Sequence, residues 1–387
     1  MYLKKLHLRS FRNYVDRQIE FTARKTILVG NNAQGKSNLL EAVELLASLK
    51  SHRTSRDREL VLDTAAASQI EAVVERAHST NELSIIFRKQ GRRTIAVNRE
   101  NLRRQLDFLG VLNAVQFSSL DLDLVRGAPD TRRSWLDGLL IQLEPVYSSI
   151  LQQYNQVLRQ RNALLKKIRA IRQDELLGAV DSLEPQLKLW DEQLAAAGSR
   201  VTRRRARVVA RLAPIAQVWH KRISGETEQL EINYLPNVEW MEDNPEKVQQ
   251  AFLAKIADRR TAEQYQGKTV VGTHRDEIEF TINQTPARYY GSQGQQRTLV
   301  LALKLAELKL IEEVIGEPPL LLLDDVLAEL DPNRQKQLLE VIGERFQTII
   351  TTTHIDSFNQ AWIKDSQVLQ VTAGEIITDN IPQRKHS

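Results

Sequence analysis

Hydrophobic residues alternate with polar ones at the start of the chain, and their spacing then changes to that of a helix. The alternating positions include Leu6, Leu8, Ile19 and Phe21, and a short apolar run follows at residues 27–29. Alternation with period two predicts half-buried strands. From residue 37 onward apolar residues recur on one helical face, at Leu39, Leu40, Val43, Leu46 and Ala47. Residues 29–47 are therefore predicted to form a strand, a loop and a helix.

The middle of the chain has a helical pattern, and strand patterns flank it on both sides. Helical spacing dominates between about residues 132 and 258, apart from one extended piece at 230–234, and breaks are expected at Gly178, Pro185, Gly198 and Pro214. Further strands are predicted at 83–87, 94–97, 277–282, 320–323 and 348–352, and helices at 295–314 and 332–346. Such alternation of strands and helices predicts an α/β fold with a mainly parallel sheet.

The two α/β parts look unable to close a sheet separately. The simplest architecture is one domain split in sequence, with a helical insertion. We therefore expect residues 1–130 and 266–387 to form one domain and residues 131–265 to form a mainly helical lobe.

Composition narrows the function classes. The 387 residues include 42% hydrophobic residues, enough for two or three domains, and Lys+Arg 54 against Asp+Glu 49 gives a net charge of +5, a weak indication of a polyanionic partner. The absence of cysteine excludes disulfides, thiolate zinc sites and thiol nucleophiles. No secretory h-region or run of roughly 20 apolar residues is present, which predicts a cytoplasmic protein with no membrane partner.

A phosphate-binding motif lies between the predicted strand and helix. Its residues are Gly30, Asn31, Asn32, Ala33, Gln34, Gly35, Lys36, Ser37 and the following Asn38, and they match G-x-x-x-x-G-K-[ST]. In such a loop the backbone N–H groups and the helix N-terminus face the β-phosphate. Lys36 would neutralise the β- and γ-phosphate oxygens, and Ser37 would bind Mg²⁺. A glycine-rich turn is the alternative, but the flanking strand and helix favour nucleotide binding.

Two carboxylates end the predicted strand at 320–323. A P-loop enzyme needs an acidic group on a neighbouring strand to hold its metal ion. We expect Asp324 to hold Mg²⁺ and Asp325 to polarise the attacking water. Without the P-loop, a strand that merely ends in solvated acids would fit equally well.

Three further segments surround this acidic strand. They are residues 290–297, with Ser292, Gln293, Gly294 and Gln295, then residues 327–331, and finally residues 351–354. With the P-loop they make the chain resemble an ABC-type ATPase head, which binds ATP and Mg²⁺. The resemblance implies that Ser292, Gly294 and Gln295 form a signature that completes the γ-phosphate site of a second subunit. The alternative is an ordinary serine N-cap on an amphipathic helix.

The chain is still more similar to the RecF family of bacterial recombination-mediator ATPases, which are related to SMC proteins. The segments that carry this similarity are residues 10–14, 30–40, 124–129 with Arg132 and Arg133, 272–276, 292–297 and 324–331. Three departures from the family pattern, at Ser119–Leu120, Thr273 and Trp135, affect loop shape rather than phosphate chemistry.

The resemblance implies roles for five more residues. Gln116 would link Mg²⁺ to the helical lobe, Asp331 would be the D-loop residue, and His354 would sense the γ-phosphate. Arg12 and Asn13 would approach the nucleotide. Gln116 alone fits a structural strand residue equally well, and Arg12 and Asn13 fit a simple turn.

Two clusters of basic residues free of acids lie in the helical segment. The candidate DNA contacts within them are Arg159, Lys166, Lys167, Arg203, Arg204 and Arg205. Basic side chains near phosphates add salt-dependent affinity without reading base sequence. A solvated helical face is the alternative. Arg88, Lys89, Arg92, Arg93, Arg103 and Arg104 form a third candidate surface.

The resemblance implies an ATP-driven homodimer that clamps gapped or single-strand/double-strand junction DNA and is released by slow ATP hydrolysis. It further implies cooperation with RecO and RecR and help in loading RecA during recombinational repair and replication. A transporter nucleotide-binding subunit, an SMC-like ATP-dependent nuclease and a structural protein remain as alternatives. The nuclease would need a further cluster of metal-binding carboxylates, which the sequence does not offer.

Overall fold

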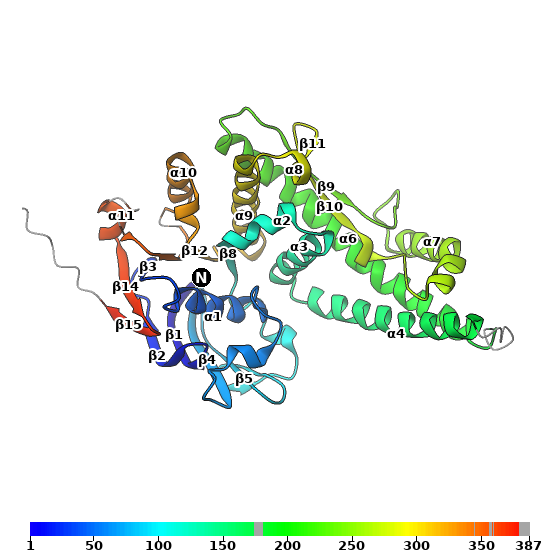
Figure 1. Cartoon of the computed structure of the whole chain (residues 1–387), viewed down its shortest axis with the longest axis horizontal. Coiled ribbons are helices and arrows are strands. Elements are labelled where there is room, and N and C mark those ends of the chain that lie inside the picture. The colour runs from blue at the N-terminus through cyan, green and yellow to red at the C-terminus, as the bar shows by residue number, and fades with distance from the viewer. Residues whose placement is uncertain (174–180, 344, 356–357, 359, 379–387) are drawn as a thin grey trace, which may run out of the picture. The chain divides into compact units, whose positions relative to one another are not determined.

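The computed structural model describes residues 1–173, 181–343, 345–355, 358 and 360–378 (Figure 1). The chain forms two compact units. Unit 1 comprises Met1–Leu122 and Val300–Ser387, and unit 2 comprises Asp123–Leu299. The domain boundaries expected from the sequence, after residues 130 and 265, stay a prediction.

The predicted parallel sheet lies in unit 1 and joins the two ends of the chain. Its strand order is β15-β14-β3-β13-β12-β8, and only β15 runs antiparallel to its neighbour. Strand β3 lies between β13 and β14, so the N-terminal part cannot form this sheet without the C-terminal part. The strands are β3 (Lys25–Val29), β8 (Ala114–Ser118), β12 (Leu320–Asp324), β13 (Thr348–Thr352), β14 (Ser366–Thr372) and β15 (Glu375–Thr378).

A second sheet in unit 1 is wholly antiparallel. Its order is β2-β1-β4-β5-β6-β7. Along β4, buried residues alternate with residues that are partly exposed, as expected for a sheet with one face in the core and one in solvent. The strands are β1 (Tyr2–Phe11), β2 (Tyr14–Glu20), β4 (Ala67–Arg76), β5 (Ser79–Arg88), β6 (Thr94–Val97) and β7 (Glu100–Asn101).

Helices precede or follow the strands of the parallel sheet along the chain. They are α1 (Lys36–Ser48), α10 (Pro332–Ile342), α11 (Gln360–Lys364) and most of α9 (Gln293–Ile315), which begins in unit 2. Helix α10 ends four residues before the expected position, because Gly343 adopts a φ of 43°.

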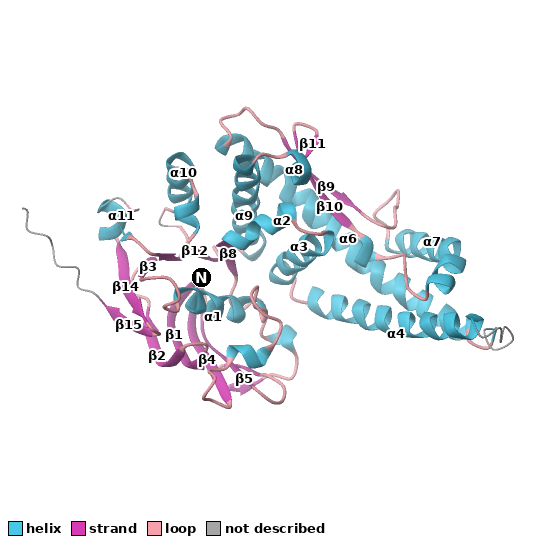
Figure 2. Cartoon of the chain, in the orientation of Figure 1, coloured by secondary structure: helices cyan, strands magenta, loops and turns pink. Residues whose placement is uncertain are grey.

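Unit 2 is mainly helical, with a small antiparallel sheet in the order β11-β10-β9 (Figure 2). Its strands are β9 (Leu230–Leu235), β10 (Glu277–Ile282) and β11 (Thr285–Pro286). Its helices are α2 (Asp123–Arg126), α3 (Pro129–Leu143), α4 (Tyr147–Gln173), α6 (Glu184–Ile223), α7 (Pro245–Gln266) and α8 (Ala287–Tyr290).

The expectation that Gly198 and Pro214 break the long helix is wrong, because α6 runs without interruption through both. A Cβ atom at Gly198 would lie 2.6 Å from Cε1 of Phe252 on α7. The glycine therefore allows two helices to pack closely. Pro185 lies in the first turn of α6, where a missing N–H costs nothing. Gly178 lies outside the described residues.

Two buried ion-pair networks hold the helices of unit 2 together. Arg161, which is 0% exposed, donates to Asp191 at 2.8 Å and to Glu263 at 2.5 Å. Arg205 donates to both carboxylate oxygens of Asp137 at 2.9 Å. Removing one partner of such a network would leave an unpaired buried charge, which is strongly destabilising. No helix among the described residues is both long enough and apolar enough to cross a bilayer.

Candidate functional site

The phosphate-binding loop connects β3 to α1 in unit 1, as predicted. Two glycines fit positions that other residues would strain. A Cβ atom at Gly30 would lie 2.3 Å from the carbonyl oxygen of Val371, and Gly35 has a φ of 114°. Asn31, Asn32 and Ala33 lie exposed on the loop. The loop therefore has the tight backbone curl that directs N–H groups towards a phosphate.

Lys36 is the first residue of α1, directly after this loop. Its Nζ atom donates to the carbonyl oxygens of Gly30 at 2.7 Å and Asn31 at 3.0 Å, and the residue is only 4% exposed. The ammonium group is thereby held beside the loop's backbone. A phosphate bound by the loop would meet a positive charge already in place.

Ser37 and Asp324 meet at the carboxyl end of the parallel sheet. The Ser37 hydroxyl donates to Oδ1 of Asp324 at 2.9 Å, and Thr351 on β13 donates to the same oxygen at 2.8 Å. Two oxygen ligands so placed suit Mg²⁺, which takes few protein ligands and completes its shell with phosphate and water. No group of three His, Cys, Asp or Glu residues that could hold a metal ion occurs in the described part of the chain.

Asp325 follows Asp324 in an unusual backbone conformation. Its φ of 54° is left-handed, and its N–H donates to Thr351 Oγ1 at 2.9 Å. Burial raises the pKa of Asp325, and nearby Lys36 opposes this shift while Asp324 adds to it. A non-glycine residue in this conformation, next to a metal-type carboxylate, is typical of a functional position. The arrangement suits a carboxylate that holds a water molecule.

Gln116 lies within a strand rather than in a loop. It faces Leu322 across the β8–β12 pair, two residues before Ser118, which faces Asp324. Because alternate residues share a face, Gln116 and Asp324 lie on the same side of the sheet. Both amide atoms of Gln116 are buried and make no hydrogen bond with any residue that the structure describes. Such an unsatisfied amide is rare and fits a residue that awaits a ligand.

Asn13 supports the loop, whereas Arg12 is held by other groups. Asn13 donates to the Gln34 carbonyl at 3.0 Å and accepts from Asn38 at 2.8 Å. Arg12 makes a two-pronged ion pair with Glu41, at 2.8 and 2.6 Å. The structure thus places Asn13 against the phosphate loop and pairs the Arg12 guanidinium with Glu41 on α1, the helix that follows the loop. Contact of either side chain with the nucleotide stays a prediction.

His354 and Asp331 lie in exposed turns after β13 and before α10. The backbone N–H of His354 donates to Thr352 Oγ1 at 3.2 Å, and its ring makes no hydrogen bond within the described residues. Asp331 accepts from the N–H of Arg334 at 3.1 Å, which caps α10. The His354 ring is therefore able to engage a ligand.

The signature segment in unit 2 forms a capping box at the start of α9. The Gln295 N–H donates to Ser292 Oγ at 3.2 Å, and the Ser292 N–H donates to Gln295 Oε1 at 2.8 Å. The capping alternative raised by the sequence is thus present. It is compatible with a signature role, because Ser292 Oγ accepts in the cap and its own hydrogen can still be donated. Gln293 and Gly294 occupy the first turn, whose N–H groups form a general anion site.

The candidate DNA contacts fall into two groups. Arg159, Lys166 and Lys167 lie exposed on α4 and make no hydrogen bond or ion pair with any described residue. In the α6 cluster, Arg203 pairs with Asp243 at 2.5 Å and Arg204 pairs with Glu144 at 3.0 Å. The α4 side chains are therefore the better placed to meet DNA.

The expectation that Arg205 contacts DNA is wrong. Its side chain is 3% exposed and paired with Asp137 and Asp276. Burial disfavours the charged guanidinium, and the pKa of Arg205 is nonetheless raised because Asp137, together with Tyr147 and Tyr234, outweighs that effect. The group cannot reach a phosphate. In the third candidate surface, Arg93 and Arg104 pair with Asp57 and Asp107.

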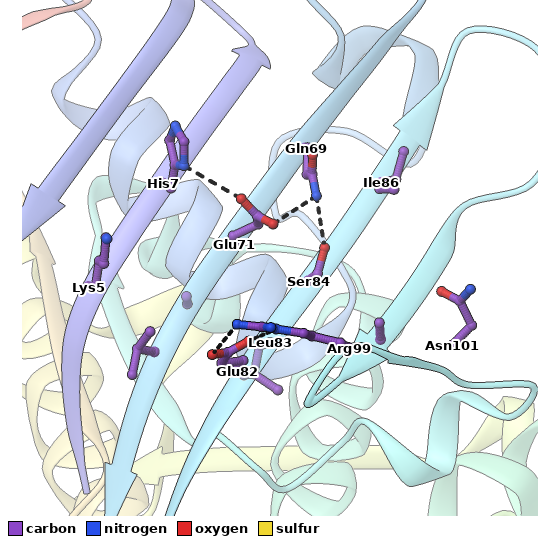
Figure 3. Close-up of a pocket in the computed structure, with 13 residues that line it drawn as sticks. Lys5, His7, Gln69, Glu71, Glu82, Leu83, Ser84, Ile86, Arg99 and Asn101 are labelled. Carbon is purple, nitrogen blue, oxygen red and sulfur yellow. Dashed lines mark hydrogen bonds and ion pairs between the residues drawn. The ribbon is translucent and has the colours of Figure 1, made fainter.

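A groove of about 520 Å³ lies on the antiparallel sheet of unit 1 (Figure 3). Side chains from β1, β4 and β5 line it, and Glu71 lies between His7 and Gln69. None of the residues predicted from the sequence to form a site lines this groove.

Sequence reasoning missed two side chains of the phosphate site. They are Thr351, which holds Asp324, and Tyr14, whose hydroxyl donates to the Gly35 carbonyl at 2.9 Å. The threonine-rich end of β13 was a usable signal for Thr351, because β13 pairs with β12. Tyr14 ends the similarity segment 10–14, but only the fold shows its contact with Gly35.

Comparison with known proteins covers nearly the whole chain. Residues 2–377 match the family model described as RecF/RecN/SMC N terminal domain. The chain is 69% identical over 381 residues to the DNA replication and repair protein RecF of Gloeothece citriformis, covering 97% of this chain and 99% of that protein. It is 67% identical over 377 residues to the RecF protein of Nostoc punctiforme, covering 97% of this chain and 99% of that protein.

Solved structures agree with these relatives. The recombination mediator protein RecF, solved in complexes described as RecF-ATPrS and RecF-ATP in the RecFOR pathway, matches with a TM-score of 0.87 in both cases, at 33% and 32% identity. Each match covers at least 97% of both chains. An Smc head domain from Pyrococcus furiosus shares the fold alone, at a TM-score of 0.53 and 17% identity over 97% of this chain and 96% of that one. The predicted fold is thus confirmed, and the chain belongs to the RecF family of ABC-type ATPases.

Proposed function

We propose that this protein is an ATP-dependent DNA clamp that acts in recombinational repair and replication. Mg-ATP would join two heads, the signature of each completing the γ-phosphate site of the other, and slow hydrolysis would release them. The observation that carries this proposal is the hydrogen bond of 2.9 Å between Ser37 and Asp324, which closes a metal-type site beside the phosphate loop.

The chain's own residues divide the chemistry among them. Lys36 and the loop N–H groups bind the phosphates, and Ser37 and Asp324 would hold Mg²⁺, with Gln116 as a further oxygen ligand. Bound Mg²⁺ supplies positive charge that offsets the charge developing on the phosphoryl oxygens. Asp325 orients the attacking water and accepts its proton. His354 contacts the γ-phosphate, and Asp331 contacts the partner head.

The relatives support the choice of partners. They are named DNA replication and repair proteins, and the solved RecF complexes belong to the RecFOR pathway. We therefore propose that the chain binds gapped or junction DNA in the cytoplasm, cooperates with RecO and RecR and promotes RecA loading. These relatives do not favour a transporter subunit.

As the pH is lowered, the rate of ATP hydrolysis is expected to fall at a higher pH than it would if Asp325 had the ordinary pKa of an aspartate. Burial raises the pKa of Asp325 above its usual value, and only the ionised carboxylate can accept a proton from water. The rate of ATP hydrolysis is therefore at its maximum when the pH is well above this raised pKa, and it is lost as the pH falls through that pKa. A pH profile of kcat/KM measures this limb, because that ratio reports the ionisation of the free enzyme. The residual rate of Asp325→Asn should lack it, and an identical limb in that variant would contradict the assignment.

Replacing Arg159, Lys166 and Lys167 together with glutamine should weaken DNA binding at low salt. Each phosphate contact contributes about 0.9 to the magnitude of the slope of log K against log salt. The slope of the triple variant should therefore be smaller in magnitude by up to about 2.7. Fluorescence anisotropy with a gapped duplex at several salt concentrations, with and without Mg-ATP, measures this slope. Affinity that ignores ATP would contradict the proposed function.

The chain offers a matched control for this experiment. Arg203, Arg204 and Arg207 also carry three positive charges, but all three are paired with acids. Their replacement with glutamine should change the slope much less. Equal losses for both triple variants would show that net charge, rather than the α4 surface, determines binding.

A further inference from the structure

The loop between α6 and β9 brings an acidic side chain to the signature segment. Glu228 lies in this loop, and its Oε1 accepts a hydrogen bond of 2.9 Å from Nε2 of Gln295. Both residues belong to unit 2 although they are 67 positions apart in the sequence. The signature is therefore held by a residue outside its own segment.

The Gln295 amide is occupied at both ends. Its oxygen accepts from the Ser292 N–H at 2.8 Å, and its nitrogen donates to Glu228. A bond from an amide N–H to a carboxylate is stronger than one between neutral groups, so Glu228 fixes which way the amide points. With the amide fixed, the cap places Ser292 and the first turn of α9 in one orientation.

Glu228 is itself held in place. Its side chain is 19% exposed, and its second oxygen lies 3.6 Å from Nε2 of His220, a side chain that is 0% exposed. The backbone beside it is pinned because Gln229 donates to Asn283 Oδ1 at 2.8 Å and Asn283 donates back to the Gln229 carbonyl at 2.8 Å. The backbone beside Glu228 is thus fixed, and its partly buried side chain lies next to the His220 ring without a hydrogen bond to it.

We propose that Glu228 is a positioning residue for the signature, which presets Ser292 and the N-terminus of α9 for the γ-phosphate held by a second copy of the chain. This inference rests on the proposed function. Glu228 acts through Gln295 and not on the nucleotide, because a carboxylate in contact with a phosphate would repel it. Presetting matters because donors fixed before binding cost no reorganisation when the anion arrives.

The test measures ATP-driven dimers by sedimentation velocity in Mg-ATP, and kcat separately from KM. Glu228→Ala should weaken the dimer and lower kcat by roughly tenfold to a hundredfold, the range expected for a lost bond to a charged group. Glu228→Gln keeps an acceptor oxygen and should restore most of the loss. Glu228→Ala combined with Gln295→Ala should be no worse than Gln295→Ala alone, because the two residues act as one unit.

A control residue lies in the same loop. Glu226 is exposed and its side chain makes no hydrogen bond or ion pair with any described residue, so Glu226→Ala should dimerise like the unmodified protein. Thermal unfolding identifies any variant that fails to fold. A Glu228→Gln protein as impaired as Glu228→Ala, or effects of Glu228→Ala and Gln295→Ala that simply add, would overturn the inference.

The same data separate the two proposals. If the unmodified protein forms no dimer in Mg-ATP, the proposed function fails whatever Glu228 does. If the unmodified protein dimerises and Glu228→Ala dimerises equally well, only the role of Glu228 is refuted.

Discussion

Ser292→Arg should abolish ATP-driven dimers while leaving ATP binding by a single head intact. Ser292 caps α9, and its short hydroxyl side chain leaves room for an anion at the helix N-terminus. An arginine side chain would fill that space. Because removal of one such donor costs roughly 10²- to 10³-fold in rate, turnover should fall at least that far. Analytical ultracentrifugation and equilibrium nucleotide binding measure the two effects separately.

Two control variants sharpen this result. Lys36→Ala should lose both nucleotide binding and dimerisation, because Lys36 belongs to the phosphate loop of the same head. Ser292→Asn retains a preferred N-cap residue, so it reveals any loss that comes only from an unstable helix end. A Ser292→Arg protein that still dimerises in Mg-ATP would refute the assignment of the signature.

Asp325→Asn should bind Mg-ATP normally and hydrolyse it roughly 10²- to 10⁴-fold more slowly, the usual contribution of a positioned proton acceptor. Asparagine removes the charge and the ability to accept a proton. It tolerates the left-handed backbone that Asp325 adopts at a φ of 54°, so the loop should keep its shape. Single-turnover hydrolysis and nucleotide affinity measure the two expectations.

Asp324→Asn is the appropriate comparison. This residue accepts from both Ser37 and Thr351, so its replacement should weaken Mg²⁺-dependent nucleotide binding as well as turnover. If Asp325→Asn were to keep normal turnover, another group would have to activate the water.

Local sequence context explains why the phosphate loop and the split sheet were predictable. A motif that determines both backbone shape and chemistry, such as residues 30–37, can be recognised from one continuous stretch of sequence. The acidic strand Leu320–Asp324 can be predicted because four leucines, which are buried in the structure, are followed by a carboxylate. The antiparallel sheet in unit 1 was not recognised as a separate sheet, because alternation identifies strands but not which strands pair.

Partners distant in sequence account for the failures. The sequence predicts Arg205 to be a surface cation, because Asp137 and Asp276, which bury it, lie 68 and 71 positions away. The sequence predicts a helix break at Gly198, because its packing partner Phe252 belongs to another helix. Glu228 carries no motif, and only the folded loop reveals its contact with Gln295.

The most direct test of the account is sedimentation velocity of Asp325→Asn protein with a labelled gapped duplex, with and without Mg-ATP. Slow hydrolysis should trap the assembled state in this variant. The account predicts a complex of two heads on DNA that forms only when Mg-ATP is present. Heads that remain single and ignore DNA in both conditions would contradict an ATP-driven clamp.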